Sequence, residues 1–193
     1  LRLSVAVGTE TERKAALQAK ADIYVINREN VVWLIEDSGI PFDFDTLVVD
    51  ELSSFKNHQT KRFRSLMKVR PKVVRIIGLT GTPSSNGLMD LWAEYRLLDM
   101  GQRLGRFIGQ YRSTYFTPDK RNGQVIVSYK PLPFADKEIY ATIADTTISS
   151  KSTDHLIMPD LVTAGHPVKL SDKQSERYYE LRQPLVLKLA GGY

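Results

Sequence analysis

Two short polar segments, each directly after an apolar run, contain the residues best suited to chemistry. Asp50 and Glu51 follow the run TLVV, and the segment TGTP follows RIIGL about thirty residues later. A strand cannot bury two adjacent carboxylates without a partner such as a metal ion, an arginine or water. The pair therefore indicates either a solvated strand end or a site for magnesium-assisted nucleotide hydrolysis. In such a site Asp50 would hold a hydrated Mg²⁺, and Glu51 would orient the attacking water or accept its proton.

The TGTP segment consists of Thr80, Gly81, Thr82 and Pro83. A single βα unit between the two segments would bring them to neighbouring strand ends. The threonine hydroxyls could then hydrogen-bond the carboxylates and report hydrolysis to the rest of the protein. The alternative is a simple turn, in which Gly81 takes a left-handed conformation and Thr82 caps the next element.

The elements that would position these residues alternate between strand and helix. Short β-branched runs over 3–7, 22–26, 46–50 and 73–80 are typical of strands buried on both faces of a parallel sheet. Helices are predicted from Thr9, which forms a capping-box pattern with Glu12, after Asn27, over 59–69, and after Asn86. This alternation predicts a three-layer α/β fold whose ligands bind at the carboxyl ends of the strands.

The second half of the sequence has a different organisation. Residues 100–118 are rich in Gly, Arg and aromatics and contain no acidic residue, and Asn122-Gly123 predicts a turn into a strand. A helix after the prolines near 131, a polar connector over 150–160, a strand over 161–170 and a helix capped by Ser171 follow. We therefore divide the chain into a main α/β region over 1–99, an insertion and bridge over 100–160, and a further region over 161–193.

Composition and charge restrict the class of protein. The 193 residues include no cysteine and three scattered histidines, which excludes a thiolate metal site and makes a zinc site improbable. The longest apolar runs are far shorter than the roughly 20 residues needed to span a bilayer. We expect a cytoplasmic protein without membrane contact.

The net charge of +5 is unevenly distributed, because residues 52–89 contain no Asp or Glu. Clustered cations favour a polyanion partner, nucleic acid first, although a solvated helix face is an equal alternative. Arginines among aromatics at 100–118 could similarly contact a nucleic-acid backbone and stack on bases, or belong to a packed helical insertion. The nucleic-acid-binding candidates are Asn27, Arg28, Lys56, Lys61, Arg62, Arg64, Arg103, Arg106 and Arg112.

Several of these segments together resemble a known family. VVDELSSFKN and LTGTPSSNGLMDLWAEYRLLD resemble motifs II and III and the following helix of the Snf2-related superfamily 2 helicases, in bacterial or phage forms. IYVINREN resembles motif Ib, and HLIMPDLVTAGHPVKLSDKQSERYYEL resembles the passage into a second RecA-like lobe. Ser53 and Ser84-Ser85-Asn86 depart from the His and LQN of larger eukaryotic members, which affects only details of coupling.

The resemblance implies a RecA-like, P-loop NTPase type of partial parallel sheet with a helical insertion. It implies that Asp50, as the Mg²⁺-linked carboxylate, and Glu51 are catalytic, and that residues 80–83 couple the nucleotide state to DNA. It implies ATP and Mg²⁺ as cofactors of the intact enzyme and double-stranded DNA as its partner.

No GxxxxGK[ST] loop occurs in the sequence, and no Gly is followed by Lys. We therefore expect a piece of a DNA-dependent ATPase, inactive alone and without bound nucleotide, whose phosphate-binding loop and arginine motifs lie in other parts of the same protein. The alternatives are a non-catalytic DNA-binding α/β module and a receiver-like phosphoacceptor domain.

Overall fold

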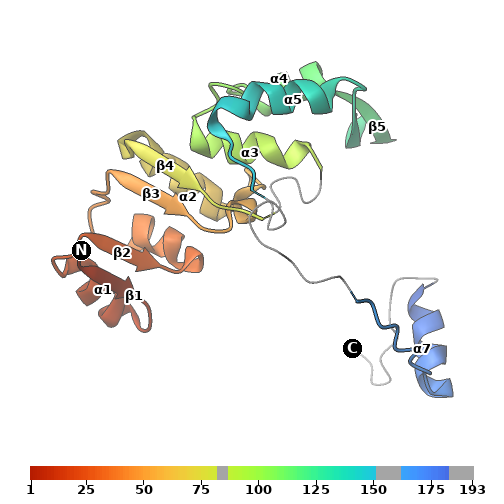
Figure 1. The fold of residues 1–193 in the computed structure, drawn as a ribbon, viewed down its shortest axis with the longest axis horizontal. Helices are drawn as coiled ribbons and strands as arrows, with labels where there is room; N and C mark the ends of the chain where they lie inside the picture. The colour runs from red at the N-terminus through yellow and green to blue at the C-terminus, as the bar shows by residue number, and fades with distance from the viewer. Residues whose placement is uncertain (82–86, 151–161, 183–193) are drawn as a thin grey trace. The chain divides into compact units, whose positions relative to one another are not determined.

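Short strands alternate with helices over the first hundred residues, as the sequence predicts (Figure 1). The computed structural model describes residues 1–81, 87–150 and 162–182. Its strands and α-helices are β1 (Leu3–Ala6), α1 (Glu10–Gln18), β2 (Ile23–Ile26), β3 (Thr46–Val49), α2 (Lys61–Val69), β4 (Arg75–Gly78), α3 (Met89–Leu98), α4 (Ile108–Tyr115), β5 (Phe116–Asn122), β6 (Val125–Pro131), α5 (Ala135–Ile143) and α7 (Asp172–Arg182).

The first four strands pair in parallel, as predicted. In the pair β1–β2, Leu3 lies opposite Ile23, and in the pair β3–β4, Val49 lies opposite Gly78. Within the described residues these are two separate two-stranded sheets, and β5 and β6 form an antiparallel third. The parallel pairs bring the carboxyl ends of β3 and β4 to the same edge.

The prediction that these strands are buried on both faces is wrong. Side chains alternate between the two faces of a strand, and only one face is covered within the described residues. Ala6 and Val49 are buried, whereas Leu3 and Val48 are 62% and 54% exposed. The β-branched runs therefore indicate the strands correctly but not their burial.

The first two helices differ in how closely they follow the prediction. Thr9 caps α1 in a full capping box, because its hydroxyl accepts from the Glu12 N–H while its own N–H donates to the Glu12 carboxylate at 2.7 Å. The second helix is irregular, with a 3-10 helix over Arg28–Asn30 and a π-helix over Trp33–Asp37. Asn27 makes no side-chain capping bond there, so one stabilising contact of a regular helix is missing.

The main core lies between α2, α3, α4 and α5, which pack together (Figure 1). Five consecutive residues of α3, 91–95, are buried, so this helix contacts protein on nearly all sides. Arg70 caps the C-terminal end of α3, because its buried guanidinium donates to the carbonyl oxygens of Leu97 and Leu98 at 2.6 and 2.5 Å. These are two of the terminal carbonyls that a helix leaves without an internal partner.

The predicted turn at Asn122-Gly123 joins β5 to β6, with Gly123 at a φ of 59°. The helix predicted after the prolines is α5. Arg112 of α4 lies over the ring of Tyr129 of β6, at 4.8 Å from the ring centre. This contact ties the hairpin to α4.

The chain divides into two units, Leu1–Ile148 and Ser149–Tyr193. In the second unit, α7 follows Ser171 as predicted, and the Gln174 side chain accepts from the Ser171 N–H at 2.9 Å. The strand predicted over 161–170 is wrong for its described part, 162–170, which has no regular secondary structure and no partner strand among the described residues. In the described parts of the chain, no helix has the length and apolar character needed to cross a membrane.

Candidate functional site at the ends of two parallel strands

The predicted carboxylates and threonine lie on adjacent strand ends. Beyond the last paired residues of β3 and β4, the Leu79 N–H donates to the Val49 carbonyl at 2.9 Å, and the Leu52 N–H donates to the Leu79 carbonyl at 2.8 Å. Asp50 and Glu51 lie between the residues that form these two bonds at the end of β3, and Thr80 directly follows Leu79 at the end of β4. The predicted juxtaposition is therefore present for the residues that the structure describes.

Glu51 takes an unusual backbone conformation where the chain leaves the sheet. Its φ and ψ are 53° and 61°, in the left-handed region that non-glycine residues rarely adopt. The turn packs Leu52 onto Gly78, where an added Cβ would lie 2.6 Å from a Leu52 methyl. Close packing at Gly78 thus helps fix the turn that presents the two carboxylates.

Asp50 and Glu51 are both exposed, as expected for a strand end. The Asp50 carboxylate accepts from the Glu51 N–H at 3.0 Å, and the Ser53 hydroxyl donates to Glu51. Neither carboxylate forms an ion pair within the described residues. Exposed, uncompensated carboxylate oxygens suit a magnesium ion, which keeps several waters and needs one or two protein carboxylates.

The remaining members of the TGTP segment are only partly described. Thr80 is half-buried and Gly81 is exposed, and both directly follow the strand end of β4. Thr82 and Pro83 lie outside the described residues, as do residues 84–86. Among the described residues, no group of three or more His, Cys, Asp or Glu side chains could form a metal site by itself.

Sequence reasoning missed Glu94, a buried carboxyl close to this strand end. Glu94 is 1% exposed, and its Oε1 atom has no hydrogen-bond partner among the described residues. The pKa of Glu94 is raised to about 8, mainly by burial; the nearby charges of Asp90 and Glu51 also contribute to the rise, and Lys56 opposes them. Apolar residues on all sides of a helix predict that the helix is buried, so the apolar residues around Glu94 in α3 could have predicted its burial.

The basic residues predicted to bind nucleic acid lie in separate groups. Lys61, Arg62 and Arg64 lie in the first turn of α2, which has no acidic residue although a helix N-terminus favours anions. Arg28 pairs with Glu29 at 3.1 Å, beside the exposed Asn27.

Lys56 and Arg112 are brought together in one pocket of about 300 Å³. Lys56 lies 3.5 Å from the Asp90 carboxylate, and His58 stands edge-on to the Trp92 ring. Burial lowers the pKa of His58, and the neighbouring charges of Arg112 and Arg64 lower it further. The imidazole is therefore neutral at pH 7, since its ordinary pKa is already 6.5.

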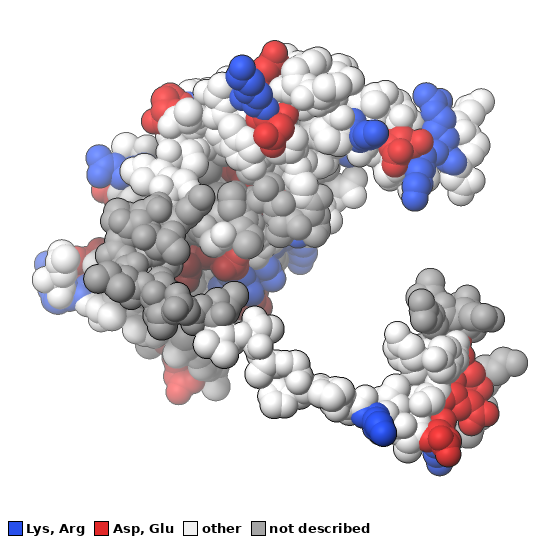
Figure 2. Space-filling model, turned by 45° about the vertical axis from the view of Figure 1, so that its right-hand side comes forward, with Lys and Arg blue, Asp and Glu red and all other residues white. Residues whose placement is uncertain are grey.

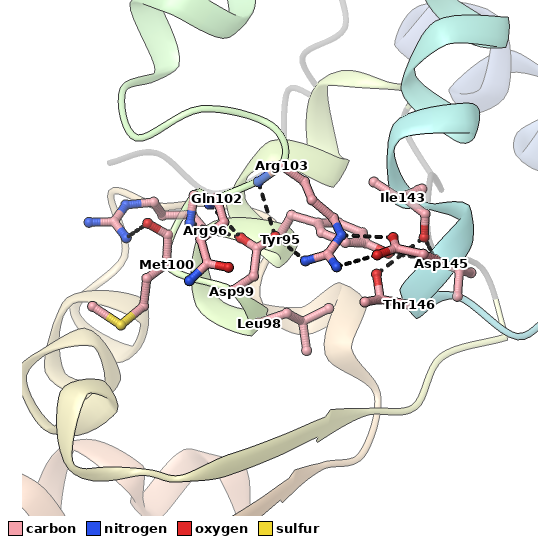
Figure 3. A network of polar contacts seen from close by, with 12 residues as sticks. Tyr95, Arg96, Leu98, Asp99, Met100, Gln102, Arg103, Ile143, Asp145 and Thr146 are labelled. Carbon is pink, nitrogen blue, oxygen red and sulfur yellow. Dashed lines mark hydrogen bonds and ion pairs between the residues drawn. The ribbon is translucent and has the colours of Figure 1, made fainter.

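Arg103 has a structural role that its sequence context did not indicate. Its guanidinium lies between Asp99, at 3.1 Å, and Asp145, which accepts two hydrogen bonds at 2.9 and 2.6 Å (Figure 3). These hydrogen bonds raise the pKa of Arg103. Arg106 is exposed and shares a second polar pocket with Arg103. On the face shown in Figure 2, basic and acidic side chains are interspersed.

Comparisons by sequence find helicases and a phage protein. The chain is 33% identical over 189 residues, 95% of its length, to the protein p41 of Acyrthosiphon pisum secondary endosymbiont phage 1, of which it covers 41%. It is 32% identical over 94 residues to YwqA of Bacillus subtilis, described as an ATP-dependent helicase/translocase, and 43% identical over 47 residues to Helicase ssl-1 of Caenorhabditis elegans. These two matches cover 46% and 24% of this chain, and 10% and 2% of those proteins. No family model matches.

Comparison with solved structures finds an ATPase core. The Sulfolobus solfataricus SWI2/SNF2 ATPase core, solved in complex with dsDNA, superposes with a TM-score of 0.52 and 24% identity over 75% of this chain and 27% of that one. The predicted α/β, RecA-like fold class is thereby confirmed. The chain spans less than half the length of each of these proteins.

Proposed function

We propose that this chain is a segment of a Snf2-related superfamily 2 helicase, a DNA-dependent ATPase that couples ATP hydrolysis to movement on double-stranded DNA or to its remodelling. The observation that carries the proposal is the pair of exposed carboxylates, Asp50 and Glu51, bonded beside the strand end that bears Thr80. The relation to helicases and the dsDNA complex of the structural neighbour support it.

Each residue of the strand end has a proposed task. When bound, a magnesium nucleotide would supply the phosphoryl group and the cation that offsets its charge. Asp50 would hold the hydrated cation, and Glu51 would orient the attacking water or take its proton. The Ser53 hydroxyl, which donates to Glu51, would keep that carboxylate in one orientation. Thr80 and Gly81, with Thr82 and Pro83 beyond them, would couple this end to DNA.

The first test is ATP hydrolysis. The chain itself is expected to hydrolyse ATP at the background rate, because its sequence contains no GxxxxGK[ST] loop to hold the phosphates. In a protein that joins this segment to such a loop, Glu51→Gln should abolish DNA-stimulated hydrolysis and leave DNA binding intact. Rapid turnover by the chain alone, lost in Glu51→Gln, would contradict the proposed division of the active site.

The second test is DNA binding by the chain. Duplex DNA should bind with an affinity that falls as salt rises, with a slope of about −0.9 in log K against log salt for each phosphate contacted. Glu51→Gln is the matched control, because it removes the proposed catalytic carboxylate and should not weaken binding. An affinity that does not respond to salt would argue against the proposed DNA partner.

A further inference from the structure

In its hydrogen bonding, Arg112 differs from most of the other buried or half-buried arginines of the unit Leu1–Ile148. It is half-buried, and its Nε atom has no hydrogen-bond partner among the described residues. Within those residues its side chain makes a cation–π contact with Tyr129 and no hydrogen bond or ion pair. Leaving a buried N–H without a partner is unfavourable, since the group gives up its bond to water and gains nothing.

Most of the other arginines of this unit that are not exposed donate at least one side-chain hydrogen bond within the described residues. Arg70 donates to backbone carbonyls, and Arg103 is held by two carboxylates. Arg13 also has a buried Nε atom without a partner, but its Nη1 donates to the Gly8 carbonyl at 2.6 Å. Arg112 is therefore a cation that the described fold holds in place without neutralising.

The surroundings of Arg112 suit an anion. It lines the pocket of about 300 Å³ together with Lys56, Asn57, His58 and Trp92. The carboxylate of Asp90 also lines the pocket and lies 3.5 Å from Lys56. Two cations and one carboxylate leave a net charge of +1, and the neutral His58 and the Asn57 amide add hydrogen-bond donors.

We propose that the pocket formed by Lys56, His58 and Arg112 binds a phosphate group. An arginine guanidinium matches phosphate in its planar arrangement of donors, and stacking on Tyr129 fixes the plane in which Arg112 presents them. The inference rests on the proposed function for one of two sources, the backbone of duplex DNA. The other source is a free phosphate or nucleotide.

The first arm of the test measures duplex DNA affinity against salt by fluorescence anisotropy. Loss of one phosphate contact removes about 0.9 from the salt slope, which corresponds to about 8-fold weaker binding at about 0.1 M salt. Arg112→Gln should show both effects, and Arg112→Lys should retain the slope. Lys137→Gln is the matched control, since it removes one exposed positive charge of α5 that does not line the pocket.

The second arm adds inorganic phosphate and follows the His58 ring by NMR. Phosphate should shift the His58 resonances in the unmodified chain and not in Arg112→Gln. In case Arg112→Gln fails to fold, both arms are repeated with Lys56→Gln, which removes the other cation that lines the pocket. Unfolding in urea verifies that each variant is native.

The outcomes distinguish a failure of the phosphate pocket from a failure of the proposed DNA partner. Equal DNA affinity and slope for the native chain, Arg112→Gln and Lys56→Gln, with no phosphate-induced shift, would overturn the pocket and leave the proposed DNA partner standing. A phosphate-induced His58 shift in a chain that does not bind DNA would support the pocket as a free-phosphate site and remove the DNA partner.

Discussion

Glu94 makes the stability of this fold depend on pH in an unusual direction. Burial moves the pKa of this carboxyl from an ordinary 4.5 to about 8 in the folded protein. Between these two values the folded state holds a proton that the unfolded state has lost. The folded state therefore binds more protons, and the free energy of unfolding falls as pH rises through this window.

The magnitude follows from the width of the window. Each unit of pKa difference corresponds to about 1.4 kcal/mol, so the stability lost between about pH 4.5 and 8 reaches about 5 kcal/mol as an upper value. A rearrangement that lets water reach the Glu94 carboxylate would cost less and would reduce the loss. A loss of this size is a large share of the 5–15 kcal/mol typical of domains.

Glu94→Gln is the perturbation that isolates this effect, because it keeps the size and polarity of the side chain but cannot ionise. The assay is urea unfolding followed by tryptophan fluorescence at a series of pH values between about 5 and 9. The unmodified chain should lose stability toward high pH, and Glu94→Gln should not. At pH 9 the variant is therefore expected to be the more stable of the two.

Other titrating groups do not obscure the comparison. His58 acts in the opposite direction, since its lowered pKa gains stability as pH rises through its folded pKa toward 6.5. Carboxylates with lowered pKa values, such as Glu36, lose their contribution only as pH falls below about 4.5. Both contributions are common to the two proteins and cancel in the difference. Parallel pH dependences for the unmodified chain and Glu94→Gln would refute the reasoning.

Three further predictions concern the arginines. Arg70→Gln should lower the free energy of unfolding by about 3 kcal/mol, measured in urea, because three backbone carbonyls lose their buried donor; full stability in this variant would mean that water replaces the guanidinium. Arg103→Gln should raise the pKa of Asp145 toward its ordinary value, since hydrogen bonds from Arg103 are the main cause that lowers it; a carboxyl NMR titration measures this, and an unchanged pKa would contradict the pairing. Arg112→Gln should raise the pKa of His58 by removing a nearby positive charge, and a fall in an imidazole NMR titration would contradict the proximity.

The sequence predicted those features that depend on local patterns. The capping box of Thr9 and Glu12 depends on residues three apart, and parallel pairing follows from short strands joined through helices. Because parallel strands end at the same edge, the neighbourhood of Asp50 and Thr80 followed as well.

Features set by distant packing were not predictable in this way. The carboxylates that hold Arg103 come from the end of α3 and, through Asp145, from a residue 42 positions later. The apolar β-branched runs predicted burial on both faces, yet Val48 is exposed, because hydrophobicity alone does not say which face another element covers. The strand predicted over 161–170 is absent from its described part, 162–170, for a related reason: the β-propensity of a segment depends on packing against a partner strand.

The left-handed backbone of Glu51 offers a test of the strand end that needs no nucleotide. For a residue with a Cβ this conformation costs about 1–2 kcal/mol, and glycine avoids that cost. At ordinary positions Ala is more stable than Gly by roughly 0.5–1 kcal/mol because of chain entropy. At position 51 the order should be reversed, with Glu51→Gly about 0.5–1 kcal/mol more stable than Glu51→Ala in urea unfolding.

Asp50 provides the matched control for Glu51, since its backbone is not among the positive-φ positions of the described residues. Asp50→Ala should therefore be at least as stable as Asp50→Gly. If Ala were favoured at both positions, the turn that presents the Glu51 carboxylate would not have the conformation described. If the order is reversed at position 51 alone, the fold bears a local strain at the residue proposed to act on water, and strain of this kind is typical of functional sites.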